Sequence, residues 1–196
     1  MAGGAEVDDP IIRGVWQVIA TDGLGAVTMR TVAQAAGVSV GRIQYRYGSK
    51  EDLLLASAAA MINGAAARHE AVRQTAEGDE TLWHLLSHVI PHDHTTTIGV
   101  SVFHHFVAAG ITRPRIAALL AEAKRGQQAE VATLLRPLLS PAADPQAAAR
   151  ALVATADGLS LQVLTGAVEA AAAAAALRAE LDRVTAATAP SAGALQ

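Results

Sequence analysis

Four cationic side chains fall in a stretch of the chain that carries no carboxylate. Between Gly23 and Lys50 the charged residues are Arg30, Arg42, Arg46 and Lys50, and acidic residues stand directly before and after this stretch. The whole chain has a formal net charge of −3, so the basic stretch is a local feature. Such a feature is typical of a surface that contacts an anionic partner such as nucleic acid. A chance run of solvated arginines would give the same count, so the spacing has to separate the two interpretations.

Two short helices joined by a tight turn are predicted within this stretch. Thr28 can cap a helix over 29–36, and Gly37 can adopt the left-handed conformation that ends it. Ser39 can cap a second helix, from 40 to about 45. Two short helices around a glycine turn are typical of a helix-turn-helix, whose second helix enters the DNA major groove. The side chains expected in the small core are Ala33, Val38, Ile43 and Tyr47.

The second helix carries side chains whose chemistry suits the reading of bases. The amide of Gln44 can pair with N6 and N7 of adenine, and Arg42 or Arg46 can reach guanine or a phosphate. Gly41 allows the helix backbone to approach the groove wall closely, and Tyr45 can contact a thymine methyl group or a phosphate. The sequence therefore predicts a recognition helix at about 39–46.

Three further residues suit contacts to the DNA backbone. Thr28 and Ser39 place hydroxyls and helix N–H groups where a phosphate can sit, and Lys50 adds a positive charge nearby. Thr28 and Ser39 can also act simply as helix caps, and the two roles are compatible. The predicted DNA-binding set is Thr28, Arg30, Ser39, Val40, Gly41, Arg42, Gln44, Tyr45, Arg46 and Lys50.

The segment 28–54 resembles the DNA-binding segment of the TetR family of bacterial repressors, and the family pattern covers about residues 8–56. The stretch 39–44 is similar to the BetI-like branch of that family. Gln44 stands where many members carry tyrosine, and Tyr47 replaces the usual phenylalanine. The resemblance implies a dimeric repressor of a palindromic DNA operator, released by a small-molecule effector. It also implies phosphate contacts by Thr28, Ser39 and Lys50.

The rest of the chain is expected to be helical. Helices are predicted at 53–76, 80–90, 97–109, 114–139, 145–167 and 169–187, because Gly and Pro separate these stretches and no long period-two alternation occurs. The expected fold is therefore all-α, with a helix-turn-helix head joined by a long helix to a helical effector-binding and dimerisation domain. The predicted divisions are a flexible start (1–7), the head (8–56), the C-terminal domain (57–188) and a flexible tail (189–196).

The family resemblance implies that the last two helices pair with a second copy as a four-helix bundle. Small residues would let the helices approach closely, although the run 170–176 can also be exposed alanine filler. The predicted dimer interface consists of Leu152, Ala156, Leu159, Ser160, Val163, Leu164, Ala167, Leu177 and Leu181.

A mostly apolar effector pocket is predicted around the three aromatic residues of the C-terminal domain. Its predicted lining is Trp83, Leu86, Phe103, His104, Phe106, Val107 and Leu119. An aromatic cage for a quaternary ammonium ion needs several rings. Because this domain has only three aromatic residues, we do not predict choline as the effector.

A histidine cluster supplies the alternative function. His84, His88 and His92 would share one face of a continuous helix, and three imidazoles can bind a transition metal, although Pro91 can end that helix first. A metal-responsive sensor on the same fold therefore stays open. A transcriptional activator also stays open, because activation or repression depends on the position of the operator. The prediction itself includes no cofactor and no metal.

Composition bounds the remaining possibilities. The chain has 196 residues, of which 52% are hydrophobic and none is cysteine, so disulfide scaffolds, thiolate zinc sites and Cys nucleophiles are excluded. No Gly-rich phosphate loop, G-x-S-x-G or H-E-x-x-H motif occurs, and no enzymatic activity is expected. The start lacks an apolar signal region, and no stretch is apolar enough for a membrane span, so a cytoplasmic protein is expected.

Overall fold

The computed structural model describes residues 9–186, and every regular element in that range is helical. The predicted all-α fold is therefore confirmed. The segments predicted to be flexible, 1–7 and 189–196, lie outside the described residues. None of the helices within 9–186 is both long and apolar enough to cross a membrane.

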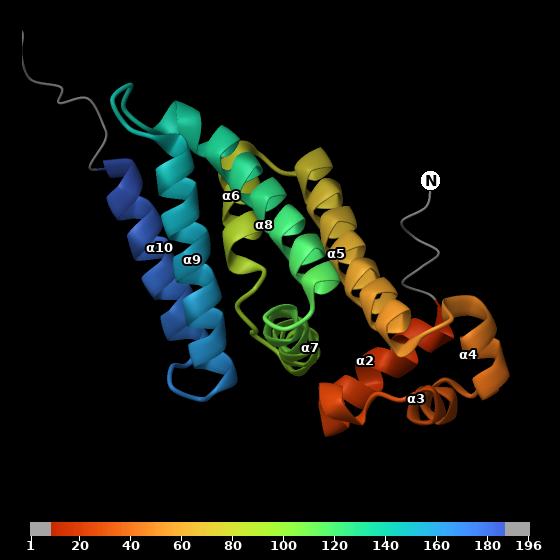
Figure 1. The fold of residues 1–196 in the computed structure, drawn as a ribbon. Helices are drawn as coiled ribbons and strands as arrows, with labels where there is room; N and C mark the ends of the chain where they lie inside the picture. The colour runs from red at the N-terminus through yellow and green to blue at the C-terminus, as the bar shows by residue number, and fades with distance from the viewer. Residues whose placement is uncertain (1–8, 187–196) are drawn as a thin grey trace, which may run out of the picture. The chain divides into compact units, whose positions relative to one another are not determined.

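The helices follow one another with short connections (Figure 1). In chain order they are α2 (Pro10–Asp22), η1 (Leu24–Ala26), α3 (Met29–Ala36), α4 (Val40–Tyr47), α5 (Lys50–Thr75), α6 (Gly78–Ser87), α7 (His94–Gly110), α8 (Pro114–Leu135), η2 (Arg136–Leu138), α9 (Pro145–Leu164) and α10 (Ala170–Ala186).

Five predicted helix bounds are wrong by three or four residues: the start of α5, the ends of α6, α8 and α9, and the start of α7. Two of these errors have a clear local cause. α7 begins three residues earlier than expected, because the Asp93 carboxylate accepts the N–H of Thr96 at 2.7 Å and stabilises the first turn. α8 stops at Leu135 instead of continuing to 139, because Pro137 forces the chain into the short 3₁₀ turn η2.

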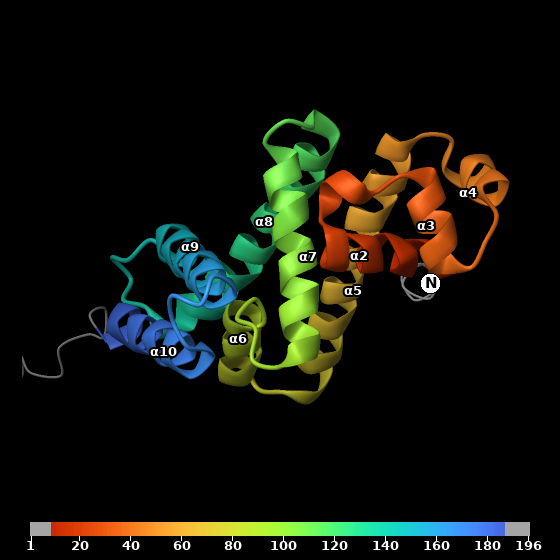
Figure 2. The same cartoon turned by 90° about the horizontal axis from the view of Figure 1, so that it is seen from below.

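The chain divides into two compact units that do not follow a single cut in the sequence. The first unit contains the chain up to Ala71 together with Ile98–Ala123, and the second contains Val72–Thr97 together with the chain from Lys124 onward. The helices α5, α7 and α8 therefore contribute residues to both units. Figure 2 shows the same helices from below.

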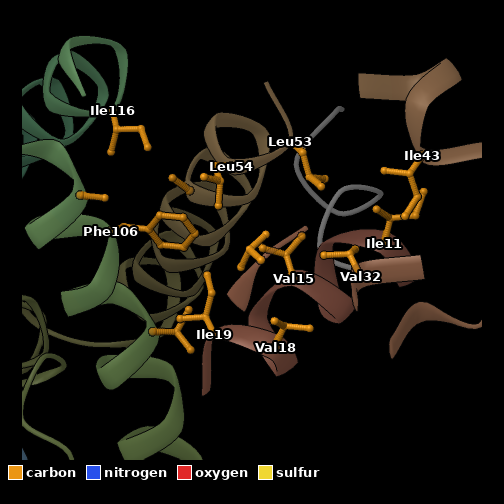
Figure 3. Close-up of a cluster of buried hydrophobic side chains, with 14 of the residues drawn as sticks. Ile11, Val15, Val18, Ile19, Val32, Ile43, Leu53, Leu54, Phe106 and Ile116 are labelled. Atoms are coloured by element: carbon orange, nitrogen blue, oxygen red, sulfur yellow. The ribbon is translucent and has the colours of Figure 1, made fainter. Parts of the chain in front are cut away.

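The core of the first unit is built around α2. Ile11, Val15 and Ile19 recur every four residues along α2 and are fully buried, so one apolar stripe of this helix faces the core. Phe106 of α7 and Ile116 of α8 belong to the same cluster (Figure 3). The four side chains predicted for the small core all lie in or against this cluster, as predicted: Ala33, Val38, Ile43 and Tyr47.

The core of the second unit lies among α6, the end of α8, α9 and α10. α9 and α10 run side by side in both views (Figures 1 and 2), and Leu152 of α9 and Leu177 of α10 are fully buried in the shared cluster. A buried polar contact adds to it, because the Ser160 hydroxyl donates a 2.6 Å hydrogen bond to the carbonyl of Val89. At the edge of this unit, Lys124 and Asp157 form an ion pair at 2.9 Å.

Candidate nucleic-acid interface

The turn between α3 and α4 is fixed by local hydrogen bonds that the residue types dictate. Thr28 is the N-cap of α3, and its hydroxyl accepts the N–H of Thr31 at 3.1 Å. Gly37 ends α3 with a φ of 65° and a ψ of 33°, the left-handed conformation that glycine adopts without steric cost. The Ser39 hydroxyl then accepts the N–H of Arg42 at 3.2 Å and starts α4. The predicted helix-turn-helix geometry is therefore present.

α4 presents different residues to the core and to solvent. Ile43 is fully buried, and Val40 and Tyr47 pack partly buried against the same core cluster. The spacing of these three residues places them on one side of the helix. Tyr45 is 95% exposed, although it is a large aromatic side chain. The ring and the hydroxyl of Tyr45 are therefore accessible to a partner molecule.

The other predicted reading residues share the exposure of Tyr45. Gly41, Arg42 and Gln44 are all exposed on α4. The predicted residue that differs is Val40, which is half-buried and packs against the core.

The residues predicted to contact phosphates lie at helix starts. Thr28, Ser39 and Lys50 are exposed, and they precede or open α3, α4 and α5 in turn. The Ser39 hydroxyl uses a lone pair for the backbone N–H, which leaves its proton available for a phosphate oxygen, whereas the Thr28 hydroxyl also lies 3.0 Å from the Thr31 hydroxyl. Arg30 is exposed in the first turn of α3. The predicted phosphate set is therefore accessible.

The first turn of α5, which carries Lys50, is held by a capping arrangement. The Ser49 hydroxyl donates a 2.6 Å hydrogen bond to Asp52, and it accepts the N–H of Asp52 at 3.1 Å. The guanidinium of Arg115 contacts the other carboxylate oxygen at 2.7 Å. The Ser49 hydrogen bond and then the Arg115 contact hold the pKa of the Asp52 carboxyl below its usual range.

Arg46 contacts a residue whose place beside α4 the sequence did not indicate. Its guanidinium lies 3.1 Å from Oδ2 of Asp9, the N-cap of α2. The Tyr47 hydroxyl donates a 2.5 Å hydrogen bond to the same oxygen. The one signal in the sequence was tyrosine in place of the usual phenylalanine at 47, since a phenol in a core needs a polar partner.

Comparison with known families decides between the functions that this geometry allows. The family model for bacterial regulatory proteins of the tetR family matches residues 11–57. The model for the C-terminal domain of BetI-type transcriptional repressors matches residues 78–186, which is more than half of the chain. The chain belongs to the TetR family. This TetR-family member is a DNA-binding transcriptional regulator, and its resemblance to the BetI-like branch is confirmed. No curated protein sequence is similar enough to count as a match.

Solved structures of transcriptional regulators share the fold. A regulator from Rhodococcus sp. Rha1 superposes with a TM-score of 0.83 at 21% identity, over 91% of this chain and 96% of that one. A regulator from Saccharomonospora viridis, solved in complex with choline, gives 0.79 at 25% identity over 88% and 94%. The multidrug binding protein EbrR, complexed with ethidium, gives 0.65 at 26% identity over 90% and 99%.

The residues predicted for an effector pocket of this TetR-family regulator belong to two different units. Phe106 is buried in the core of the first unit, and Leu119 packs against that core. Leu86 is buried in the core of the second unit, where the guanidinium of Arg178 lies 3.8 Å from the centre of the Trp83 ring. The remaining predicted residues belong to the first unit: Phe103, His104 and Val107. The pocket stays a prediction.

The predicted dimer residues of α9 and α10 fall into two groups. Five of them are buried within the single chain: Leu152, Ala156, Ser160, Leu177 and Leu181. The surface that a second copy can reach includes the others, which are half-buried or exposed: Leu159, Val163, Leu164 and Ala167.

The three histidines of the metal-sensor alternative do not share a helical face. α6 ends at Ser87, so His88 stands at its C-cap and His92 lies beyond Pro91. The rings of His84 and His88 have centroids 6.2 Å apart. Within residues 9–186, no group of three or more His, Asp or Glu side chains is placed to hold a metal ion. The structure therefore gives no support to this alternative.

Proposed function

We propose that this TetR-family regulator is a dimeric repressor that places α4 of each protomer in the major groove of one half of a palindromic operator. The observation that carries the proposal is the outward side of α4. It exposes Tyr45 almost completely, together with Arg42 and Gln44, while Ile43 anchors the helix from the opposite side. A helix held in this way presents its polar side chains to the base edges without loss of core contacts.

The proposed DNA contacts are of two kinds, contacts to bases and contacts to phosphates. Gln44 pairs with adenine, Arg42 reaches guanine, and Tyr45 covers a thymine methyl group or a phosphate. Thr28, Ser39, Lys50 and Arg30 contact phosphates and set the register of the protein on the duplex. The first group determines which sequence is bound, and the second determines how affinity depends on salt.

Dimerisation through α9 and α10 is supported by the family and by the remaining surface of these helices. Leu159, Val163 and Leu164 are incompletely buried, and Leu161 of α9 is 50% exposed. A twofold contact would cover this apolar surface. The two halves of the operator are then spaced by about one helical turn of DNA or a simple multiple of it.

A small organic effector is the proposed signal. The C-terminal domain matches the BetI-type model, a structurally similar regulator has been solved with choline, and the similar multidrug binding protein EbrR has been solved with ethidium. An effector that binds better to the state in which the heads do not fit the operator would release the repressor. The action proposed here is control of transcription in the cytoplasm, and it includes no enzymatic step.

A gel-shift experiment with the protein's own upstream promoter DNA tests the proposal. Wild type is compared with Gln44→Ala, with Lys50→Ala and with Arg125→Ala, a matched control that removes an exposed cation from α8. We expect Gln44→Ala to lose preference for the promoter, and Lys50→Ala to weaken all sequences alike. Arg125→Ala should bind as wild type does.

The outcomes separate the parts of the proposal. If wild type binds other DNA specifically but not this promoter, autoregulation is wrong and the operator lies elsewhere. If wild type binds no DNA even at low salt, the proposed function is wrong. Sedimentation of the free protein tests the dimer separately, and a monomer at micromolar concentration would contradict the palindromic operator.

A further inference from the structure

The buried carboxylate of Asp9 joins the start of α2 to the end of the recognition helix α4. Only 2% of this side chain is exposed. Its Oδ1 accepts the N–H of Ile11 at 3.0 Å, as an N-cap residue does. Its Oδ2 accepts the Tyr47 hydroxyl at 2.5 Å and faces the Arg46 guanidinium at 3.1 Å. One carboxylate therefore receives donors from the backbone of α2 and from two consecutive side chains of α4.

The Tyr47 contact acts on the orientation of α4. This helix has only eight residues, and Ile43 is its only fully buried residue. The packing of Ile43, Val40 and the Tyr47 ring holds α4 against the core but is not directional, whereas a hydrogen bond near the end of the helix fixes its direction. The Tyr47 hydroxyl supplies this hydrogen bond, which is of the stronger, charge-assisted kind because its acceptor is an ionised carboxylate.

The Arg46 contact determines where the positive charge of this side chain lies. Arg46 is half-exposed and carries one of the four cations of the basic stretch, yet its guanidinium faces a carboxylate that is shielded from water. If Arg46 moved to a DNA phosphate, it would leave that buried carboxylate without its cation, and an uncompensated buried charge is strongly destabilising. The guanidinium also lies 5.5 Å from the centre of the Tyr47 ring, which favours the same position.

We infer that Asp9 is a positioning residue of the recognition helix, which fixes the end of α4 through Tyr47 and withholds Arg46 from the DNA. This inference rests on the proposed function, since it assigns roles within the same DNA-binding surface. Base reading is then confined to the first part of α4, at Arg42, Gln44 and Tyr45. Of the two arginines of α4, only Arg42 reaches the DNA.

The salt dependence of DNA binding distinguishes this role from a merely structural one. The slope of log K against log salt concentration changes by about 0.9 for each phosphate contact made or lost. Asp9→Asn removes the charge but keeps a good N-cap residue, because asparagine caps helices about as well as aspartate. A recess of about 190 Å³, lined by Asp9 and Arg46 among others, leaves the released guanidinium room to move.

We therefore expect Asp9→Asn to steepen the salt slope by about 0.9, as Arg46 gains a phosphate. The double variant Asp9→Asn/Arg46→Gln should return to the wild-type slope. An unchanged slope in folded Asp9→Asn overturns the withholding of Arg46. A slope that is shallower by about 0.9 in Arg46→Gln alone also overturns it, because Arg46 would then already contact a phosphate.

Tyr47→Phe tests the orientation of α4 independently, and it inserts the residue that is usual in the family. We expect its ratio of operator binding to nonspecific binding to fall several-fold while its salt slope stays at the wild-type value. An unchanged ratio would contradict the anchoring role. The variant also keeps the inference testable if Asp9→Asn fails to fold, which circular dichroism would reveal. Absence of DNA binding by wild type would instead refute the proposed function itself.

Discussion

Arg115 and Asp52 form an ion pair at 2.7 Å that joins the first turn of α8 to the first turn of α5. Both side chains are about half-exposed, so the pair contributes little to stability by itself. Its importance lies in its position, because Asp52 also accepts the Ser49 hydrogen bond that starts α5. The helix start that carries Lys50 is thereby attached to α8.

The Asp52 contacts predict a change in stability at acid pH. Since Ser49 and then Arg115 lower the pKa of this carboxyl in the folded protein, protonation disfavours the folded state. The stabilisation is present above the carboxyl's unfolded-state pKa, about 3.9, and is lost as the pH falls through the lower folded value. Thermal unfolding of wild type and Asp52→Asn should differ in Tm near neutral pH and converge once the pH falls below the lowered folded-state pKa of Asp52. A difference that persists unchanged in acid would contradict this assignment.

Gly14 marks the closest approach of α2 and α3. A Cβ at Gly14 would lie 3.0 Å from the Cβ of Ala36 and 3.1 Å from its backbone nitrogen. Gly14→Ala should therefore destabilise the protein by about 1–3 kcal/mol, despite the better helix propensity of alanine. Gly126→Ala in α8 is the matched control, since nothing lies within 4 Å of its Cβ, and it should stabilise by about 1 kcal/mol. Urea denaturation measures both, and equal changes in the two variants would contradict close packing at Gly14.

The buried Ser160 hydroxyl should contribute measurably to the second unit. Ser160→Ala leaves the Val89 carbonyl without its 2.6 Å donor in a buried position, so we expect a loss of about 1–3 kcal/mol in the free energy of unfolding. Thr133→Ala removes an exposed hydroxyl that bonds within its own helix, and it should change stability by less than about 0.5 kcal/mol. If the two variants lose equal stability in chemical denaturation, the Ser160 contact is not important for the fold.

The Arg178 guanidinium over the Trp83 ring gives a spectroscopic prediction. The chain has two tryptophans, so Trp16→Phe leaves Trp83 as the sole indole emitter. In that background, Arg178→Gln should change the intensity or wavelength of Trp83 fluorescence, because a cation 3.8 Å from the ring centre is removed. Arg183→Gln, which breaks only the exposed contact to Glu180, should leave the spectrum as it was. Identical spectra for all three proteins would rule out a cation over this ring.

The elements of the head were predictable because their signals are local. Thr28, Gly37 and Ser39 act within four residues of their own positions, so their roles can be read directly from the sequence. The contact of Asp9 with Arg46 and Tyr47 joins residues 37 and 38 positions apart. No spacing rule relates such positions, and the contact depends on how α2 and α4 pack.

The face of a helix within a bundle was the harder property to predict. Leu152 and Leu177 have the residue type of an interface, yet they are buried where α9 meets α10 within one chain. Hydrophobic periodicity identifies the apolar side of a helix but not the partner that covers it. A shared helical face for His84 and His92 required the helix to continue past Ser87, and the end of that helix was not predicted correctly.

The separation of residues on α4 has a consequence for how this regulator can evolve. Ile43 and Tyr47 maintain the fold from one side of the helix, whereas Arg42, Gln44 and Tyr45 project from it into solvent. Exposed positions of this kind tolerate substitution with little change in stability. With α4 reading the operator as proposed, descendants of this chain can acquire new operator preferences by single substitutions while their fold stays intact.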